Sequence, residues 1–179
     1  RHHMVARAET ESPGLASIRG ESVNGDPDWI PEFLEFAGTW DTFVDKVYER
    51  FLDDLVRQQS LFLGQRVGVR RHPESWGKGH GFWHCVSEGG LEDERVPDLE
   101  RCRRIGWIRA VIENADGPDV ECWTNARGRE MCHLLWYREE YLVVLAARND
   151  FFLLKTAYLT DRPHTKRKLR AEADRAKKG

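Results

Sequence analysis

The 179-residue sequence has no apolar run near the length of about 18 residues that a membrane-spanning helix needs. It also lacks a recognisable secretory signal peptide. Hydrophobic residues make up 40% of the chain and charged residues 32%, which is an ordinary balance for a globular protein. These features predict a cytoplasmic protein of one domain with tails, with no membrane partner.

The chain also lacks the paired spacings of a zinc site, because none of its four cysteines forms a CxxC motif. His80, His84 and Cys85 lie close together in the sequence, and Cys132 precedes His133. On a strand, adjacent residues point to opposite faces, so each group would offer one ligand to a shared site. We therefore expect no metal, no cofactor and free thiols rather than disulfides.

Motifs for nucleophilic catalysis and for nucleotide binding are missing as well. No GxSxG sequence occurs, and the glycine-rich segment 77–81 lacks the order of a phosphate-binding loop and the helix that follows one. The remaining chemistry that the residues could support is acid–base catalysis by side chains.

Charge is unevenly distributed along the chain. The net charge is −2, but residues 165–178 contain seven basic and two acidic side chains, and the remainder is correspondingly acidic. A basic terminus favours an anionic partner such as RNA. A solvated basic helix without a partner explains the same composition, and both interpretations stay open.

Three regions are expected along the chain. Residues 1–4 resemble the end of a purification tag, and residues 5–28 are too polar to form a core, so 1–28 is predicted to be a tag remnant and flexible arm. Residues 29–162 are predicted to form a single domain, and 163–179 a basic C-terminal helix or tail.

Two helical patterns lie in the predicted domain. Within 40–56, apolar residues recur at steps of three and four while charged residues take the opposite face, with Thr39 as N-cap. A second apolar stripe spans 99–112 and should end at the Asp-Gly-Pro sequence 116–118. Between them, the glycines of segment 72–90 argue against a regular helix.

The rest of the domain predicts strands. The alternation of 66–70 indicates a half-buried strand, and apolar segments separated by short turns follow at 120–124, 132–137, 141–147 and 151–160. Segments 141–145 and 151–154 are apolar on both faces and should lie at the centre of a sheet. The expected fold class is α+β, with N-terminal helices packed on a four- to five-stranded antiparallel meander and a basic C-terminal helix.

Residues suited to cleaving RNA at its own 2′-hydroxyl occur from residue 78 onward. That reaction needs a proton acceptor, a proton donor and cations around the phosphate, but no metal. Histidine suits the first two tasks, and arginine binds two phosphate oxygens. Side chains of these kinds, together with two hydroxyls, are His80, His84, His164, Lys78, Arg104, Arg148, Lys155, Thr156 and Tyr158.

The order of these features resembles a known family. A histidine-bearing segment and an Arg-rich helix precede a meander whose last strand contains Lys155-Thr156-Ala157-Tyr158, and a basic helix follows. This is similar to the barnase, EndoU, colicin and RelE-like nucleases (the BECR fold), especially their phage-associated branch. The resemblance covers about half of the chain, roughly residues 78–170. It implies a metal-independent hydrolase, often a toxin with an antitoxin partner, that acts on RNA.

The resemblance also implies roles for individual residues. His84, with His80, would act as general acid or base, Thr156 and Tyr158 as orienting or relay hydroxyls, and Arg104 as the phosphate ligand. The residues expected to bind the substrate around them are Lys78, Arg101, Arg148, Lys155, His164, Lys166 and Arg167.

A second hypothesis is a non-catalytic phage or host interaction protein, such as an inhibitor or accessory factor. Tryptophan is a frequent anchor of protein interfaces, so Trp40, Trp76 and Trp83 would form its contact surface. A third is that the basic tail binds nucleic acid without chemistry. Convergence of His84, Arg104, Thr156 and Tyr158 on one accessible pocket would favour the nuclease.

Overall fold

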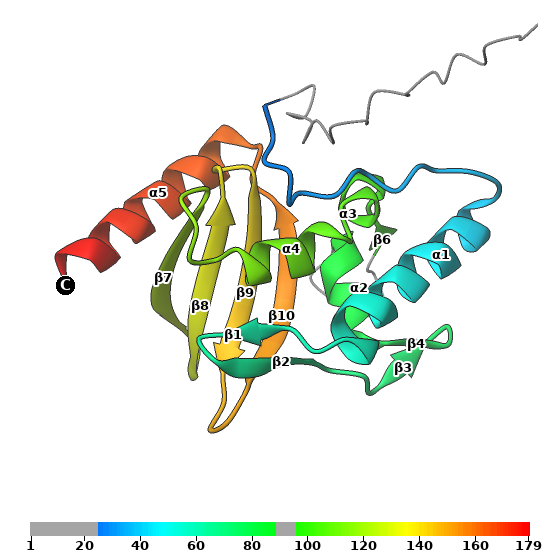
Figure 1. Ribbon diagram of the computed structural model, residues 1–179, viewed down its shortest axis with the longest axis horizontal. Helices are drawn as coiled ribbons and strands as arrows, with labels where there is room; N and C mark the ends of the chain where they lie inside the picture. The colour runs from blue at the N-terminus through cyan, green and yellow to red at the C-terminus, as the bar shows by residue number, and fades with distance from the viewer. Residues whose placement is uncertain (1–24, 89–95) are drawn as a thin grey trace, which may run out of the picture.

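A curled sheet of six strands forms the centre of the protein in the computed structural model, which describes residues 25–88 and 96–179 (Figure 1). Its strand order is β1-β2-β10-β9-β8-β7. The strands are β1 (Leu61–Phe62), β2 (Gln65–Val69), β7 (Val120–Arg127), β8 (Glu130–Tyr137), β9 (Tyr141–Ala147) and β10 (Phe152–Leu159). The predicted arm, including the tag-like residues, lies almost entirely outside the described residues.

The α+β class and the antiparallel meander β7-β8-β9-β10 are confirmed, but the prediction of a four- to five-stranded antiparallel sheet is wrong. The sheet is mixed, because β2 pairs in parallel with residues Phe152–Leu154 of β10. The short strand β1 then pairs antiparallel with β2. The alternation of 66–70 predicts a strand, yet a local pattern does not identify a partner more than 80 residues away.

Each face of the sheet has its own hydrophobic core. One face packs against α1 (Trp40–Leu52), α2 (His80–Val86), α3 (Leu99–Arg103) and α4 (Trp107–Glu113), and the other against α5 (Pro163–Lys178). We call them the helical face and the α5 face. Strand β9 lies between β8 and β10 and is buried along its length except at its last residue, as its two-sided apolar sequence predicts.

Helix α1 follows the predicted pattern closely. Its apolar stripe buries Phe43, Val47 and Phe51 in the core of the helical face, and the Thr39 side chain accepts a hydrogen bond from the Thr42 amide as N-cap. The stripe continues past the helix into a π-helical turn, η1 (Asp53–Arg57).

Helix α2 contradicts the expectation that segment 72–90 has no regular helix. The small hairpin β3 (Glu74–Ser75) and β4 (Lys78–Gly79) leads directly into it. Its glycines allow close packing: a Cβ on Gly81 would lie 3.0 Å from the Arg70 carbonyl oxygen, and one on Gly79 would lie 2.9 Å from that of Arg71. The Gly81 amide donates a 2.7 Å hydrogen bond to the Arg70 carbonyl. The glycines therefore serve backbone contact rather than a loop.

The second predicted helix is broken into α3 and α4. A two-stranded ladder, β5 (Ser87–Glu88) with β6 (Val96–Pro97), precedes it, and the Asp98 side chain caps α3. The break falls at Gly106, where a Cβ would lie 2.7 Å from an Arg50 guanidinium nitrogen and 3.2 Å from Pro31. The N-terminal segment thus crosses the helix at the break, and the Trp107 indole donates to the Pro31 carbonyl.

The C-terminal basic helix is present as predicted, but it packs on the sheet. Leu169 and Ala173 are buried against the α5 face. Both carboxylate oxygens of Glu121 on β7 accept hydrogen bonds from Arg170, and the Lys177 ammonium lies 2.5 Å away. Part of the basic charge is therefore used within the protein.

A buried hydrogen-bond network joins the turn after β8 to the end of β10. The fully buried Thr160 hydroxyl accepts from the Trp136 indole at 2.9 Å and donates to the Glu139 carbonyl at 2.8 Å. The Thr160 amide donates to the Glu140 carbonyl. No helix among the described residues is long and apolar enough to cross a membrane.

Candidate functional site

Helix α2 lies alongside β10, at the part of the strand that β2 leaves unpaired. The Thr156 hydroxyl donates a 2.9 Å hydrogen bond to the His84 carbonyl. This bond satisfies a carbonyl in the last turn of α2, where intrahelical donors are missing. Further along, the Asp98 amide donates to the Val86 carbonyl. We call His80, His84 and Thr156 the α2–β10 site.

The two histidines of this site are neighbours on one side of α2. They are four residues apart, so their side chains lie one above the other on the helix. Their ring centroids are 4.2 Å apart with the planes tilted by 37°. Both residues are half-buried. The sequence analysis expected no regular helix in this segment, and the helix is what brings the two rings together.

An irregularity in β10 directs Thr156 and Tyr158 to the α5 face. The pairing with β9 shifts between Leu154 and Thr156, which leaves Lys155 without a partner residue. After the shift, Thr156 faces Val144 and Tyr158 faces Leu142, two residues of the α5-face core. The two hydroxyl residues therefore share a face.

Tyr158 lies between two cavities. One, of about 300 Å³, includes Arg101, whose guanidinium carbon lies 5.5 Å from the Tyr158 ring centroid. Arg101 also donates to the Ser87 carbonyl and pairs with Glu88 at 3.4 Å. The other, of about 550 Å³, lies between the sheet and α5, and we call it the α5 groove. Its lining residues are Asn125, Arg127, Tyr158, His164, Thr165, Lys168, Leu169 and Glu172.

Lys155 and Arg148 form a separate basic pair at Glu130. Arg148 lies 2.7 Å and Lys155 3.2 Å from the Glu130 carboxylate. Hydrogen bonds from Arg148 and then Lys155 lower the pKa of Glu130 below its ordinary value. Lys155 directly precedes Thr156, so this cationic cluster adjoins the α2–β10 site.

Lys78 and Arg104 lie apart from these groups, as their contacts show. The Lys78 ammonium is 2.6 Å from Asp45 and stands over the Tyr48 ring, on the side of α2 that faces α1. Arg104 pairs with Glu100 at 2.5 Å and stacks over Phe33, and its side chain is only 15% exposed. Arg104 therefore does not converge with the residues that the resemblance assigns to the site.

The α5 helix supplies His164 to the α5 groove, whereas Lys166 and Arg167 do not line it. The sequence analysis did not identify Asn125, Arg127 and Lys168, which line the α5 groove, as site residues. It ended the strand of β7 at Thr124, although the alternation of the chain continues to Arg127. It treated the basic residues of α5 as a group, and only the packing of Leu169 determines that Lys168 faces the groove.

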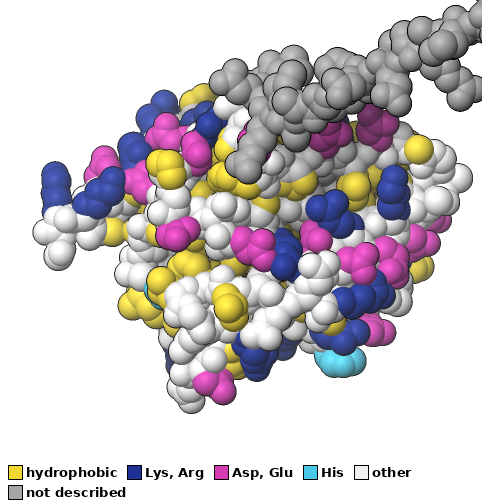
Figure 2. Space-filling view, in the orientation of Figure 1, with side chains coloured by type: hydrophobic (Ala, Val, Ile, Leu, Met, Phe, Trp, Pro, Cys, Tyr) yellow, Lys and Arg dark blue, Asp and Glu magenta, His cyan; other side chains and the backbone are white. Residues whose placement is uncertain are grey.

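The surface of the helical face does not offer a continuous basic area. Figure 2 shows basic and acidic side chains interspersed over the described residues of this view. Among all the residues that the structure describes, no group of three or more His, Cys, Asp or Glu side chains is placed to hold a metal ion. None of the four cysteines forms a disulfide.

Comparisons of the chain with protein-family models, with curated proteins and with solved structures found no match, so the chemistry of the site rests on its own geometry.

Proposed function

We propose that the protein is a metal-independent endoribonuclease whose acid and base lie in the α2–β10 site. The observation that carries the proposal is the pair of imidazole rings of His80 and His84, 4.2 Å apart, next to the Thr156 hydroxyl that binds the His84 carbonyl. Histidine is the side chain whose ordinary pKa lies nearest to physiological pH, which suits it to both proton transfers.

The reaction needs no group beyond these side chains and the RNA. One imidazole takes the proton of a ribose 2′-hydroxyl as its oxygen attacks the adjacent phosphorus. The bond from phosphorus to the 5′-oxygen of the next nucleotide breaks, and the other imidazolium protonates that oxygen. The products are a 2′,3′-cyclic phosphate and a 5′-hydroxyl. The 2′-hydroxyl makes the reaction specific for RNA.

Cations for the substrate come from the basic pair at Glu130. Lys155 adjoins Thr156 in β10, and its partner Glu130 also holds Arg148. A phosphate bound by Lys155 would replace Glu130 as its partner and would gain charge-assisted hydrogen bonds. Lys155 would then be the phosphate ligand, the role that the resemblance to BECR-fold nucleases implies for Arg104.

The α5 groove extends the binding surface along the same face of β10. Tyr158 is two residues from Thr156 on one strand, about 7 Å away, which is close to the spacing of phosphates along an RNA strand. The groove beyond it contains Arg127, His164 and Lys168. A single strand lying along β10 would thus meet the acid–base pair first and basic side chains next.

Cleavage of RNA by the purified protein tests the proposal. The protein should cut total RNA, or a labelled single-stranded oligonucleotide, in the presence of EDTA and leave 2′,3′-cyclic phosphate ends. His80→Ala and His84→Ala should each lower the rate by about 100-fold or more, which is the usual contribution of one general acid or base. His72→Gln, an exposed histidine outside the site, is the matched control and should cleave normally.

Two results would contradict the proposal. Equal cleavage by wild type and both histidine variants, purified in parallel, would identify the activity as a contaminant. Intact total RNA and intact tRNA after incubation with folded protein would also exclude it. A toxin of a toxin–antitoxin or phage-defence system is the setting that suits such an enzyme, so expression of wild type, but not of His84→Ala, should stop bacterial growth.

A second candidate function is favoured by one residue. Trp76, at the tip of the β3–β4 hairpin, is 90% exposed, which is unusual for a large apolar side chain. Such a residue suits a non-catalytic interaction protein that binds a host or phage protein through an aromatic anchor. In that case Trp76→Ala abolishes capture of the partner, whereas His84→Ala leaves it unchanged.

A further inference from the structure

The curl of the sheet brings its two ends close together on the helical face. Strands β1 and β7 are the outermost in the strand order, yet the Phe62 ring on β1 lies 5.4 Å from the His133 ring on β8, the neighbour of β7. The Phe152 ring on β10 lies 4.9 Å from Phe62 and 5.0 Å from His133. These three rings join the two ends of the curled sheet and leave a space at the seam.

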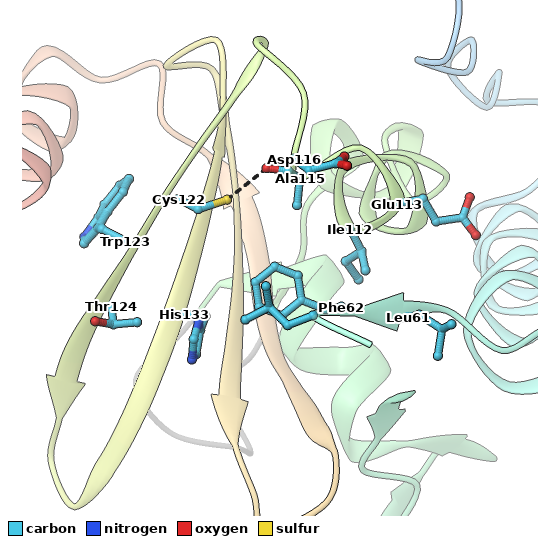
Figure 3. A pocket seen from close by; sticks show the side chains of 11 residues that line it. Leu61, Phe62, Ile112, Glu113, Ala115, Asp116, Cys122, Trp123, Thr124 and His133 are labelled. Carbon is cyan, nitrogen blue, oxygen red and sulfur yellow. Dashed lines mark hydrogen bonds between the residues drawn. The ribbon is translucent and has the colours of Figure 1, made fainter. Parts of the chain in front are cut away.

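That space is a half-open cavity of about 470 Å³, which we call the seam pocket (Figure 3). Figure 3 shows its walls coming from β1, the end of α4, β7 and β8. The lining residues are Leu61, Phe62, Leu63, Ile112, Glu113, Ala115, Asp116, Cys122, Trp123, Thr124 and His133. A mainly apolar cavity of this size in the mouth of a curled sheet is typical of small-molecule sites.

The imidazole of His133 and the thiol of Cys122 in the seam pocket are neutral. Burial lowers the pKa of His133 below its ordinary value, so the imidazole is uncharged at pH 7. The Cys122 thiol donates to the Ala115 carbonyl, and the loss of water around its sulfur raises its pKa to about 11. The pocket therefore presents a neutral imidazole and a thiol rather than a thiolate.

Formal charge at the seam pocket is negative. Glu113 and Asp116 are its two carboxylates, and no Lys or Arg is among its lining residues. Arg109 pairs with Glu113 at 2.7 Å, which leaves Asp116 as the main source of uncompensated charge. Asp116 is close enough to Cys122 to contribute to the raised pKa of the thiol. An anion such as a phosphate would be repelled, whereas a cation would be attracted.

We propose that the seam pocket binds a small, mainly apolar molecule that carries a cationic amine. The apolar part fills the space between Phe62, Ile112 and His133, and the amine lies near Asp116 at the mouth. Leu61 and Leu63 are largely exposed at the rim, and a ligand of this kind would cover them. None of its lining residues belongs to the α2–β10 site or to the α5 groove, so the seam pocket is independent of the proposed cleavage of RNA.

Three indole compounds of similar shape but different charge test the proposal: tryptamine, indole and indole-3-propionate. Isothermal titration calorimetry of the full-length protein should show tryptamine binding most tightly and indole-3-propionate most weakly. The preference for tryptamine over indole should be about two- to fivefold, since the charge pair is partly exposed to water. Amide NMR shifts on binding should centre on residues of the seam pocket.

Variants at two positions make the test specific. Thr124 is exposed and lines the pocket, so Thr124→Trp should fill it and weaken tryptamine binding at least about tenfold, whereas Thr124→Val, its control, should bind normally. Asp116→Asn should remove the preference for tryptamine over indole. Circular dichroism establishes that each variant is folded. Equal or tighter binding of indole-3-propionate, or full tryptamine binding by folded Thr124→Trp, overturns the proposal.

Discussion

We expect the hydrogen bond from the Thr156 hydroxyl to the His84 carbonyl to hold α2 against β10. Helix α2 has only seven residues, so its last carbonyls depend on partners outside the helix. The Trp83 carbonyl accepts from the Ser87 amide, and the His84 carbonyl accepts from Thr156 at 2.9 Å. Replacing Thr156 with valine keeps the shape of the side chain and removes the donor.

The expected cost of Thr156→Val follows from the partial burial of the bond. A typical intramolecular hydrogen bond contributes about 1 kcal/mol to the free energy of unfolding, and water can partly replace a donor at a half-buried position. We therefore expect a loss of about 1 kcal/mol, or about 2–4 °C in Tm for a protein of this length. Thr156→Ser keeps the hydroxyl and should lose less.

Urea unfolding followed by circular dichroism measures this difference, with equal m values as the control for an unchanged unfolded state. Because Thr156 positions the helix that carries both histidines, Thr156→Val should also lower kcat for RNA cleavage more than it changes KM, and Thr156→Ser should restore much of it. Wild-type stability in Thr156→Val, or equal destabilisation by valine and serine, would refute the reasoning.

Three other variants probe the packing around the sheet. Thr160→Val leaves the buried Trp136 indole without its acceptor, so urea unfolding should show a loss of about 1–3 kcal/mol, larger than for Thr156→Val. Gly81→Ala should destabilise the protein by about 1 kcal/mol or more in the same assay, although alanine favours helices, because the new methyl group would crowd the Arg70 carbonyl. Burial alone would raise the pKa of Glu121, but its hydrogen bonds to Arg170 and Lys177 of α5 outweigh burial and lower that pKa below 4.5. The folded protein therefore stabilises the ionised carboxylate of Glu121. Glu121→Gln should therefore cost about 1 kcal/mol at pH 7, and the difference from wild type should vanish as the pH falls below 4.5, as chemical unfolding at several pH values can show.

Elements with a strong local pattern could be predicted from the sequence. Helix α1 has an unbroken apolar stripe and a threonine cap, and the meander strands β8, β9 and β10 are apolar segments separated by short turns. In these elements the side chains that form the pattern are the ones that are buried, so local and tertiary preferences agree. Boundaries differ by a few residues, as at β7, which continues past Thr124.

Features that depend on contacts between distant segments could not be predicted. The glycines around His80 read as loop residues because close approach to the backbone at Arg70 and Arg71 is invisible in a local window. Gly106 breaks the second helix because the N-terminal segment and Arg50 pack there. The parallel pairing of β2 with β10 likewise joins segments that are far apart in the sequence. The position of Arg104, stacked on Phe33, likewise follows from how the N-terminal segment that contains Phe33 crosses the helices.

The single extra residue in β10 determines which side of the sheet carries Thr156 and Tyr158. In a strand without it, alternation would place Thr156 and Tyr158 on the same face as Leu154, against the buried core of the helices. The shift at Lys155 keeps Leu154 and Ala157 in that core and moves the two hydroxyls to the α5 face. It also frees Lys155 to reach Glu130. The sequence Lys155-Thr156-Ala157-Tyr158 is therefore compatible with a buried structural strand or with a substrate-binding one, and the bulge, which re-aims side chains, favours the second.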